Sequence, residues 1–60
     1  MKRKDILKKL RDAGFTFLEG ANHTRAYDRD GVYRCPIGRH AEIPTPLVRR
    51  MERQTGVKLL

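Results

Sequence analysis

Residues 15–37 read FTFLEGANHTRAYDRDGVYRCPI, and this stretch decides the fold. Its two phenylalanines alternate with a threonine, which is the period of a strand, so a first strand is expected over residues 15–19. The short run 20–22 is typical of a tight connection. After it, residues 23–27 and 32–37 form two further extended segments. The stretch therefore predicts three strands joined by short turns.

The turn between the second and third segments has the sequence Asp28-Arg29-Asp30-Gly31, which is a hairpin signal. Gly31 can adopt the positive φ of a type I turn closed by a bulge. Two pairing registers remain compatible with the sequence. Strand alternation alone places His23, Arg25 and Tyr27 on one face of the sheet.

An amphipathic helix is predicted before the first strand. Apolar residues recur there at helical spacing, and basic residues fill the remaining positions. The apolar positions are Ile6, Leu7, Leu10 and Ala13, and the basic ones are Lys2, Lys4, Lys8, Lys9 and Arg11. Gly14 suits the left-handed residue that ends such a helix. We interpret most of the lysines as its solvated face.

A second helix is predicted after the strands. The hydroxyl of Thr45 suits the N-cap, Pro46 suits the first turn, and Gly56 suits the end of the helix. The apolar side of this helix carries Leu47, Val48 and Met51, and its other side carries Arg49, Arg50 and Arg53. These arginines could contact phosphates, an acidic protein surface, or neither.

The predicted order is helix, three strands, helix, in a single domain over residues 1–60. Two helices on one face of a three-stranded antiparallel sheet form a two-layer α+β sandwich whose other face is open. The double-stranded-RNA-binding fold has the same order, although a fold does not fix a function. The core is expected to contain Leu10, Phe15, Phe17, Val48 and Met51.

The chain is strongly basic. Its 60 residues include 14 lysines and arginines against 7 acidic residues, which gives a net charge of +7. An anionic partner is expected, with nucleic acid as the leading class, although an anionic membrane surface or an acidic protein would also satisfy the charge. No apolar run approaches the ~20 residues of a membrane span or resembles a signal peptide, so a cytoplasmic location is expected.

A single cysteine, Cys35, excludes an internal disulfide and any four-cysteine metal site. It lies in a predicted strand, where cysteine usually behaves as a small hydrophobic residue. A zinc site built from Cys35, His23 and His40 lacks the paired short spacings of such sites. The chain also has no phosphate-binding glycine loop, so we expect no cofactor.

His23 is the residue with the most chemical information. Histidine gives and takes protons near neutral pH without special tuning, because its ordinary pKa is about 6.5. An imidazole on a cationic surface suits phosphodiester chemistry. A chain with one small core favours a polymer lying across an open face over an enclosed small substrate. Tyr27 and Tyr33 could stack on bases or pack against neighbouring side chains.

Several segments resemble the HicA family of bacterial toxins. They are Lys4-Asp5 through Leu10 and Gly14, the run Gly20-Ala21-Asn22-His23, and Arg39-His40 shortly before a final helix that ends at Gly56. The resemblance spans nearly the whole chain. Its most specific part is the run of glycine, small residue, asparagine and histidine after the first strand.

The resemblance implies a toxin that cleaves messenger RNA, has a fold similar to the double-stranded-RNA-binding domain, and is held inactive by a HicB antitoxin. The free toxin would be a monomer, and the inhibited complex a hetero-oligomer. The resemblance also implies that His23 is catalytic, that Gly20 positions it, and that Asn22 belongs to the same loop. Ala21 replaces the family's usual serine, and Gly38 replaces a proline usual before the Arg-His pair.

The reaction we expect uses the RNA's own nucleophile. Neutral His23 would remove the proton of a 2′-hydroxyl, whose oxygen then attacks the adjacent phosphorus. Arg25, Arg34 or Arg39 would stabilise the developing charge, and water or His40 would protonate the leaving oxygen. The reaction requires no metal and leaves a 2′,3′-cyclic phosphate.

Two other hypotheses come from different functional classes. In the first, the chain is a non-catalytic RNA-binding module, in which His23 only supports the turn and RNA stays intact. In the second, the last helix reads DNA. A helix-turn-helix needs two helices joined by a short turn, whereas the strands within residues 15–37 separate them here, so this hypothesis ranks last.

Overall fold

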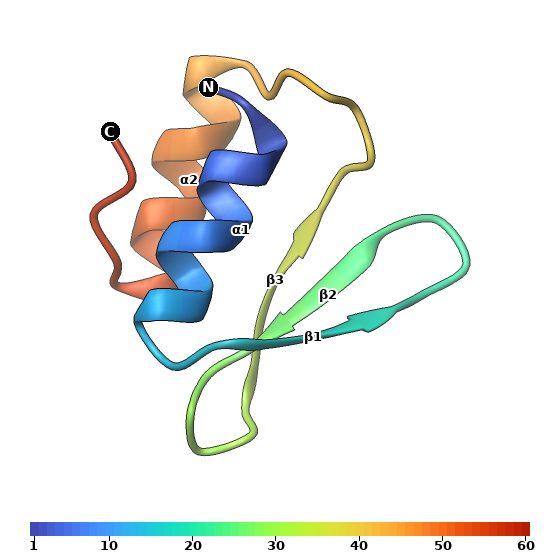
Figure 1. The fold of residues 1–60 in the computed structure, drawn as a ribbon, viewed down its shortest axis with the longest axis vertical. Coiled ribbons are helices and arrows are strands. Elements are labelled where there is room, and N and C mark those ends of the chain that lie inside the picture. The colour runs from blue at the N-terminus through green and yellow to red at the C-terminus, as the bar shows by residue number, and fades with distance from the viewer.

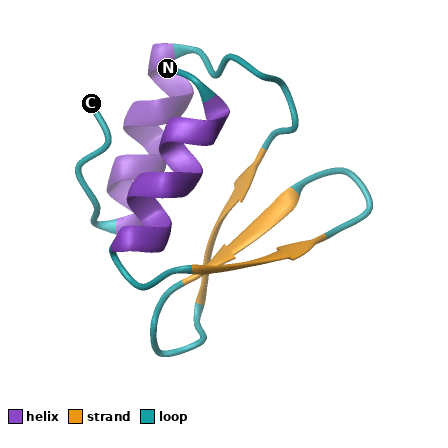
Figure 2. Cartoon of the chain, in the orientation of Figure 1, coloured by secondary structure: helices purple, strands orange, loops and turns teal.

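The sheet in this computed structural model contains three antiparallel strands in the order β1-β2-β3 (Figure 1). The structure describes residues 1–60. In chain order the elements are α1 (Arg3–Asp12), β1 (Thr16–Glu19), β2 (Thr24–Tyr27), β3 (Tyr33–Ile37) and α2 (Thr45–Thr55). The predicted α+β order of helix, three strands and helix is confirmed, and each strand begins one residue later than expected (Figure 2).

The turn between β2 and β3 is built by Asp28 and Gly31. Gly31 has a φ of +80°, which confirms it as the left-handed residue of the turn. The Asp28 carboxylate accepts hydrogen bonds from the backbone N–H groups of Asp30 (2.9 Å) and Val32 (3.0 Å). These bonds hold the pKa of Asp28 below its ordinary value, the largest contribution coming from Val32.

The register that the sequence left open is now defined. Tyr27 pairs with Tyr33, whereas Ala26 pairs with Cys35, so Arg34 is the additional residue of a β-bulge. On the other side of β2, Leu18 of β1 pairs with Arg25. The sheet therefore carries defined cross-strand rows on each of its faces.

Both helices cover the same face of the sheet, as expected (Figure 1). The inward residues of the strands include Ala26, Cys35 and Ile37, which are fully buried. The core consists of Ile6, Leu10, Phe15, Ala26, Cys35, Ile37, Ile43, Val48, Met51 and Leu59, with Phe17 packed against it. Every predicted core residue thus contributes, although Phe17 is only partly buried.

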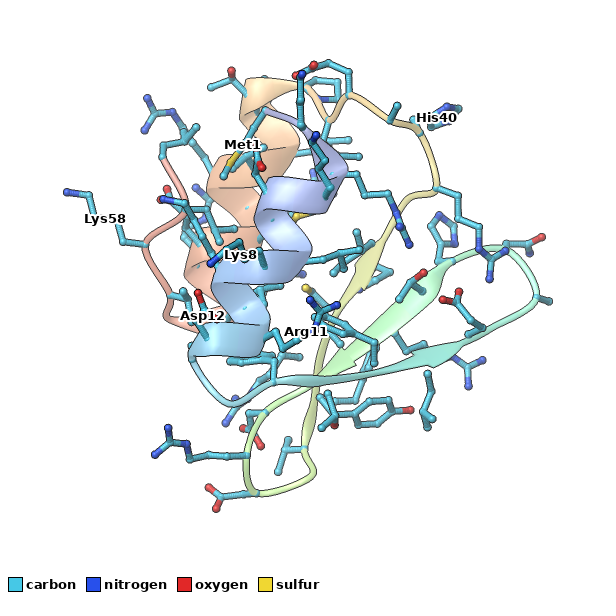
Figure 3. The ribbon with its side chains drawn as sticks, in the orientation of Figure 1. Met1, Lys8, Arg11, Asp12, His40 and Lys58 are labelled. Carbon is cyan, nitrogen blue, oxygen red and sulfur yellow. The ribbon has the colours of Figure 1, made fainter.

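The ends of both helices follow the predicted glycines. Gly14, with a φ of +93°, comes just after α1, and Gly56, with a φ of +73°, caps the end of α2. The outer side of α1 is solvated, and there Lys8 donates to Asp12 over 3.1 Å in an exposed pair one turn apart (Figure 3).

The predicted N-cap of α2 is wrong. Pro44 occupies the cap position and Thr45 is already helical, with no capping hydrogen bond from a side chain. The reason is that the Pro44 carbonyl accepts hydrogen bonds from the N–H groups of both Leu47 (3.0 Å) and Val48 (3.1 Å). Those are the donors that a capping hydroxyl at Thr45 would have satisfied.

The loop between β3 and α2 is tied to the beginning of α1. The N–H of Arg3 donates to the Ala41 carbonyl (2.9 Å), and the N–H of Ile43 donates to the Met1 carbonyl (2.8 Å). Ile43 is also part of the core. Backbone hydrogen bonds and the burial of the Ile43 side chain therefore both stabilise the loop that carries His40.

Candidate active site

His23 is presented by a closed loop between β1 and β2. The Gly20 N–H donates to the His23 carbonyl over 2.8 Å, which draws the ends of the loop together. A Cβ atom at Gly20 would lie 2.9 Å from that carbonyl oxygen and 3.2 Å from Arg25 Nε. Only glycine fits at position 20 without displacing the backbone of His23, which gives the expected role of Gly20 a physical basis. Ala21 and Asn22 are exposed within the same loop.

Arg39, which follows β3 in the chain, stabilises this loop through hydrogen bonds. Its guanidinium donates to the carbonyls of Gly20 (2.6 Å) and Ala21 (3.3 Å) and to the Glu19 carboxylate (2.9 Å). One rigid guanidinium thus contacts the consecutive residues Glu19, Gly20 and Ala21 at the beginning of the loop. The hydrogen bond from Arg39, followed by that from Thr24, keeps the pKa of Glu19 below its ordinary value.

A second part of the network reaches the beginning of α1. Buried Thr24 donates to Glu19 over 2.8 Å and accepts a hydrogen bond from Arg3 Nη2 over 2.6 Å. Arg3 Nε also donates to the Gly38 carbonyl over 2.9 Å. The His23 loop and the His40 loop are thus connected through one set of hydrogen bonds.

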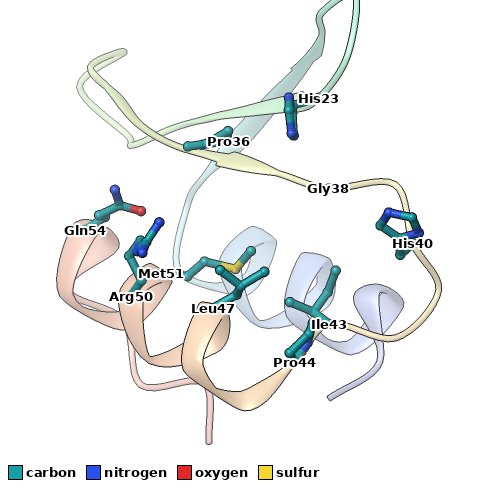
Figure 4. A pocket seen from close by; sticks show the side chains of 10 residues that line it. All are labelled: His23, Pro36, Gly38, His40, Ile43, Pro44, Leu47, Arg50, Met51 and Gln54. Atoms are coloured by element: carbon teal, nitrogen blue, oxygen red, sulfur yellow. The ribbon is translucent and has the colours of Figure 1, made fainter.

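These two loops open onto one cavity between the sheet and α2 (Figure 4). The cavity has a volume of about 290 Å³. Its polar side chains are His23, His40, Arg50 and Gln54, and its apolar floor includes Leu47 and Met51. Both imidazoles are exposed and neither forms a hydrogen bond or an ion pair within the protein, so their ring nitrogens are free to hydrogen-bond to a bound molecule.

The three arginines expected near His23 differ in their surroundings. Arg39 stabilises the loop as described above, and Arg34 forms an ion pair with Asp28 over 2.7 Å at the hairpin turn. Arg25 is exposed, lies against Gly20, and has no hydrogen-bond or ion-pair partner. Of the three, Arg25 is the one whose guanidinium is unengaged beside His23.

Cys35 lies in the core and does not reach this cavity. Burial raises the pKa of its thiol to about 11. No group of three or more histidine, cysteine or acidic side chains is arranged to hold a metal ion. No helix combines the length and apolar character needed to cross a membrane.

Sequence reasoning missed four residues of this region. Arg50 was one of three equivalent helix arginines until the fold placed it in the cavity. Arg3, Glu19 and Thr24 gave no signal because each contacts residues distant in the chain. The alternation that makes Thr24 inward-facing could have flagged it, since a buried hydroxyl needs partners.

In chemical terms, the cavity combines two accessible imidazoles with an arginine, and Arg25 lies beside one of them. Such a set offers two groups for proton transfer and two cations for the stabilisation of negative charge. Comparisons with protein-family models, curated proteins and solved structures gave no match to this chain.

Proposed function

We propose that this protein is an endoribonuclease that cleaves messenger RNA without a metal ion, with His23 as the general base. The observation that carries the proposal is that His23, on a loop fixed by Arg39 and Gly20, shares a cavity with His40 and Arg50. The net charge of +7 suits a polyanionic substrate.

In the proposed reaction, neutral His23 takes the proton of a 2′-hydroxyl, and the 2′-oxygen attacks the adjacent phosphorus. The bond from phosphorus to the 5′-oxygen breaks, and that oxygen takes a proton from His40 or from water. Arg25 and Arg50 offer charge stabilisation to the non-bridging oxygens. The products are a 2′,3′-cyclic phosphate and a 5′-hydroxyl.

The resemblance to the HicA family extends this proposal to a biological role. The chain would be the toxin of a type II toxin-antitoxin system, cytoplasmic, monomeric when free and neutralised in a hetero-oligomer with a HicB-type antitoxin. The run from Gly20 to His23 and the order of elements support this role, as does a double-stranded-RNA-binding-like arrangement of two helices on one face of the sheet. Arg50, which has no hydrogen-bond or ion-pair partner, offers an acidic inhibitor the same contacts as a phosphate.

The test is cleavage of an end-labelled single-stranded RNA in excess EDTA by the parent protein and by His23→Ala. We expect the parent to leave cyclic-phosphate ends and His23→Ala to lose cleavage while still binding RNA, because lysine and arginine contacts dominate affinity. A matched control is Arg53→Ala, which removes a cation outside the cavity and should cleave normally. Equal cleavage by His23→Ala would refute the assignment, and intact RNA with every variant would favour the non-catalytic binding module.

A further inference from the structure

The face of the sheet that the helices leave open carries two cross-strand rows. One row is Leu18, Arg25 and Pro36, and the other is Thr16, Tyr27 and Tyr33. Leu18 is 61% exposed and Tyr33 is 48% exposed. Five of the six side chains are exposed and Tyr27 is half-buried, and neither tyrosine belongs to the core.

The two tyrosines form a pair on this surface. Their ring centroids are 5.6 Å apart and the rings are tilted by 59°. Because Tyr33 is exposed and Tyr27 is half-buried, part of each residue remains accessible to a ligand. The β-bulge at Arg34 is what brings Tyr33 opposite Tyr27, because without the extra residue the alternation would turn Tyr33 to the other face. The aromatic pair therefore depends on a specific irregularity of the sheet.

The pair is continuous with the surroundings of His23. Tyr27, Tyr33 and Arg25 line one shallow hollow, and Tyr33 and Arg25 also line a second hollow with His23. His23 then belongs to the cavity that contains His40 and Arg50. The chain has 7 acidic residues, and none of them lines any of these three depressions.

We propose that Tyr27, Tyr33 and Arg25 form a platform on which unpaired bases of single-stranded RNA stack beside the phosphate at His23. The inference rests on the proposed function and adds its substrate class, a flexible strand with exposed bases. Aromatic and guanidinium planes stack on bases, and Arg25 can also contact the backbone. A duplex hides its base faces, so it cannot use the platform.

The amino-acid composition provides a direct probe. Tyr27 and Tyr33 are the only tyrosines, and the chain has no tryptophan, so its intrinsic fluorescence reports on the platform alone. The experiment titrates the parent protein with a 2′-O-methyl oligouridylate, which cannot supply the attacking 2′-hydroxyl and so stays intact. We expect saturable quenching by the single strand and none by a 2′-O-methyl duplex of equal length.

Affinities of variants for the same labelled strand, measured by anisotropy, complete the test. Tyr33→Leu should weaken binding by about 5- to 150-fold, which is the range for one lost stacking contact. Tyr33→Phe keeps the ring and should bind within about threefold of the parent. Unchanged affinity of Tyr33→Leu, or equal quenching by the duplex, would overturn the inference and leave this face to a protein partner.

The outcome is separable from that of the proposed function. Cleavage of RNA by the parent without tyrosine quenching would leave the nuclease intact and refute the platform. Quenching by the single strand without cleavage of ordinary RNA would support the platform and refute the nuclease.

Discussion

Substitution of Gly20 by alanine tests whether the loop geometry sets the activity. The added Cβ would lie 2.9 Å from the His23 carbonyl oxygen. Carbon and carbonyl oxygen atoms approach only to about 3.3–3.6 Å, so the His23 backbone must shift by roughly 0.4–0.7 Å. That shift would lengthen the 2.8 Å hydrogen bond from Gly20 to His23 to roughly 3.2–3.5 Å, at or beyond the normal limit of about 3.2 Å.

We expect the displacement to lower the cleavage rate by about 10- to 100-fold, because a misplacement near 1 Å costs about 10²-fold. The fold should lose about 1–3 kcal/mol of stability, as overpacked sites usually do. The assay is single-turnover cleavage of labelled RNA, with urea unfolding of the same sample to show that Gly20→Ala is folded.

The matched control is Gly38→Ala, just after β3. A Cβ there would meet nothing closer than His40 Cδ2 at 3.9 Å, which is an ordinary contact. Gly38→Ala should therefore cleave within about threefold of the parent. The reasoning fails if Gly20→Ala is as active as the parent, or if both alanine variants lose activity equally.

Three further predictions concern stability and reactivity. Glu19 has a lowered pKa in the folded protein, so its contribution to stability is present above its ordinary value of 4.5 and is lost as the pH falls through the lowered value. Thermal unfolding should therefore show a smaller difference between the parent and Glu19→Gln in acid than at pH 7, and a constant difference would contradict this. Cys35 should resist alkylation until urea unfolds the chain. The rise of its pKa from 9.0 to about 11 lowers the thiolate fraction about a hundredfold at pH 8. Rapid labelling of the native protein would contradict the burial of Cys35. Leu10→Ala should lower the free energy of unfolding, measured in urea, by about 2–5 kcal/mol because Leu10 is fully buried. Leu18 is exposed, so Leu18→Ala should change the free energy of unfolding by less than about 0.5 kcal/mol.

Local signals were sufficient to predict the elements of this fold. Gly14, Gly31 and Gly56 all adopt the positive φ that their positions indicated, and each strand was located to within one residue. The cap of α2 was wrong because Pro44 and Pro46, on either side of Thr45, offer competing ways to enter the helix, and local propensity does not rank them. The register depended on a bulge, which tertiary packing selects and turn residues alone do not.

The site was less predictable because its geometry depends on long-range contacts. Arg39 and Glu19 are 20 residues apart, and Arg3 and Gly38 are 35 apart. From the sequence, Arg39 was one of three equal candidates for stabilising charge at a phosphate, and Arg3 was not a candidate at all. Only the fold separates those engaged by carbonyls and carboxylates from those that remain unpaired.

This separation changes what the net charge of +7 means for function. Arg3, Arg34 and Arg39 already bind acceptors within the protein, so a phosphate at their positions would have to compete with an existing hydrogen bond. Arg25 and Arg50 have no such partner, and both adjoin depressions that contain His23. In the proposed function, the general charge would attract RNA from any direction, whereas Arg25 and Arg50 would favour the orientation that brings its backbone to His23. Attraction and positioning thus belong to different residues, and only the second depends on the fold.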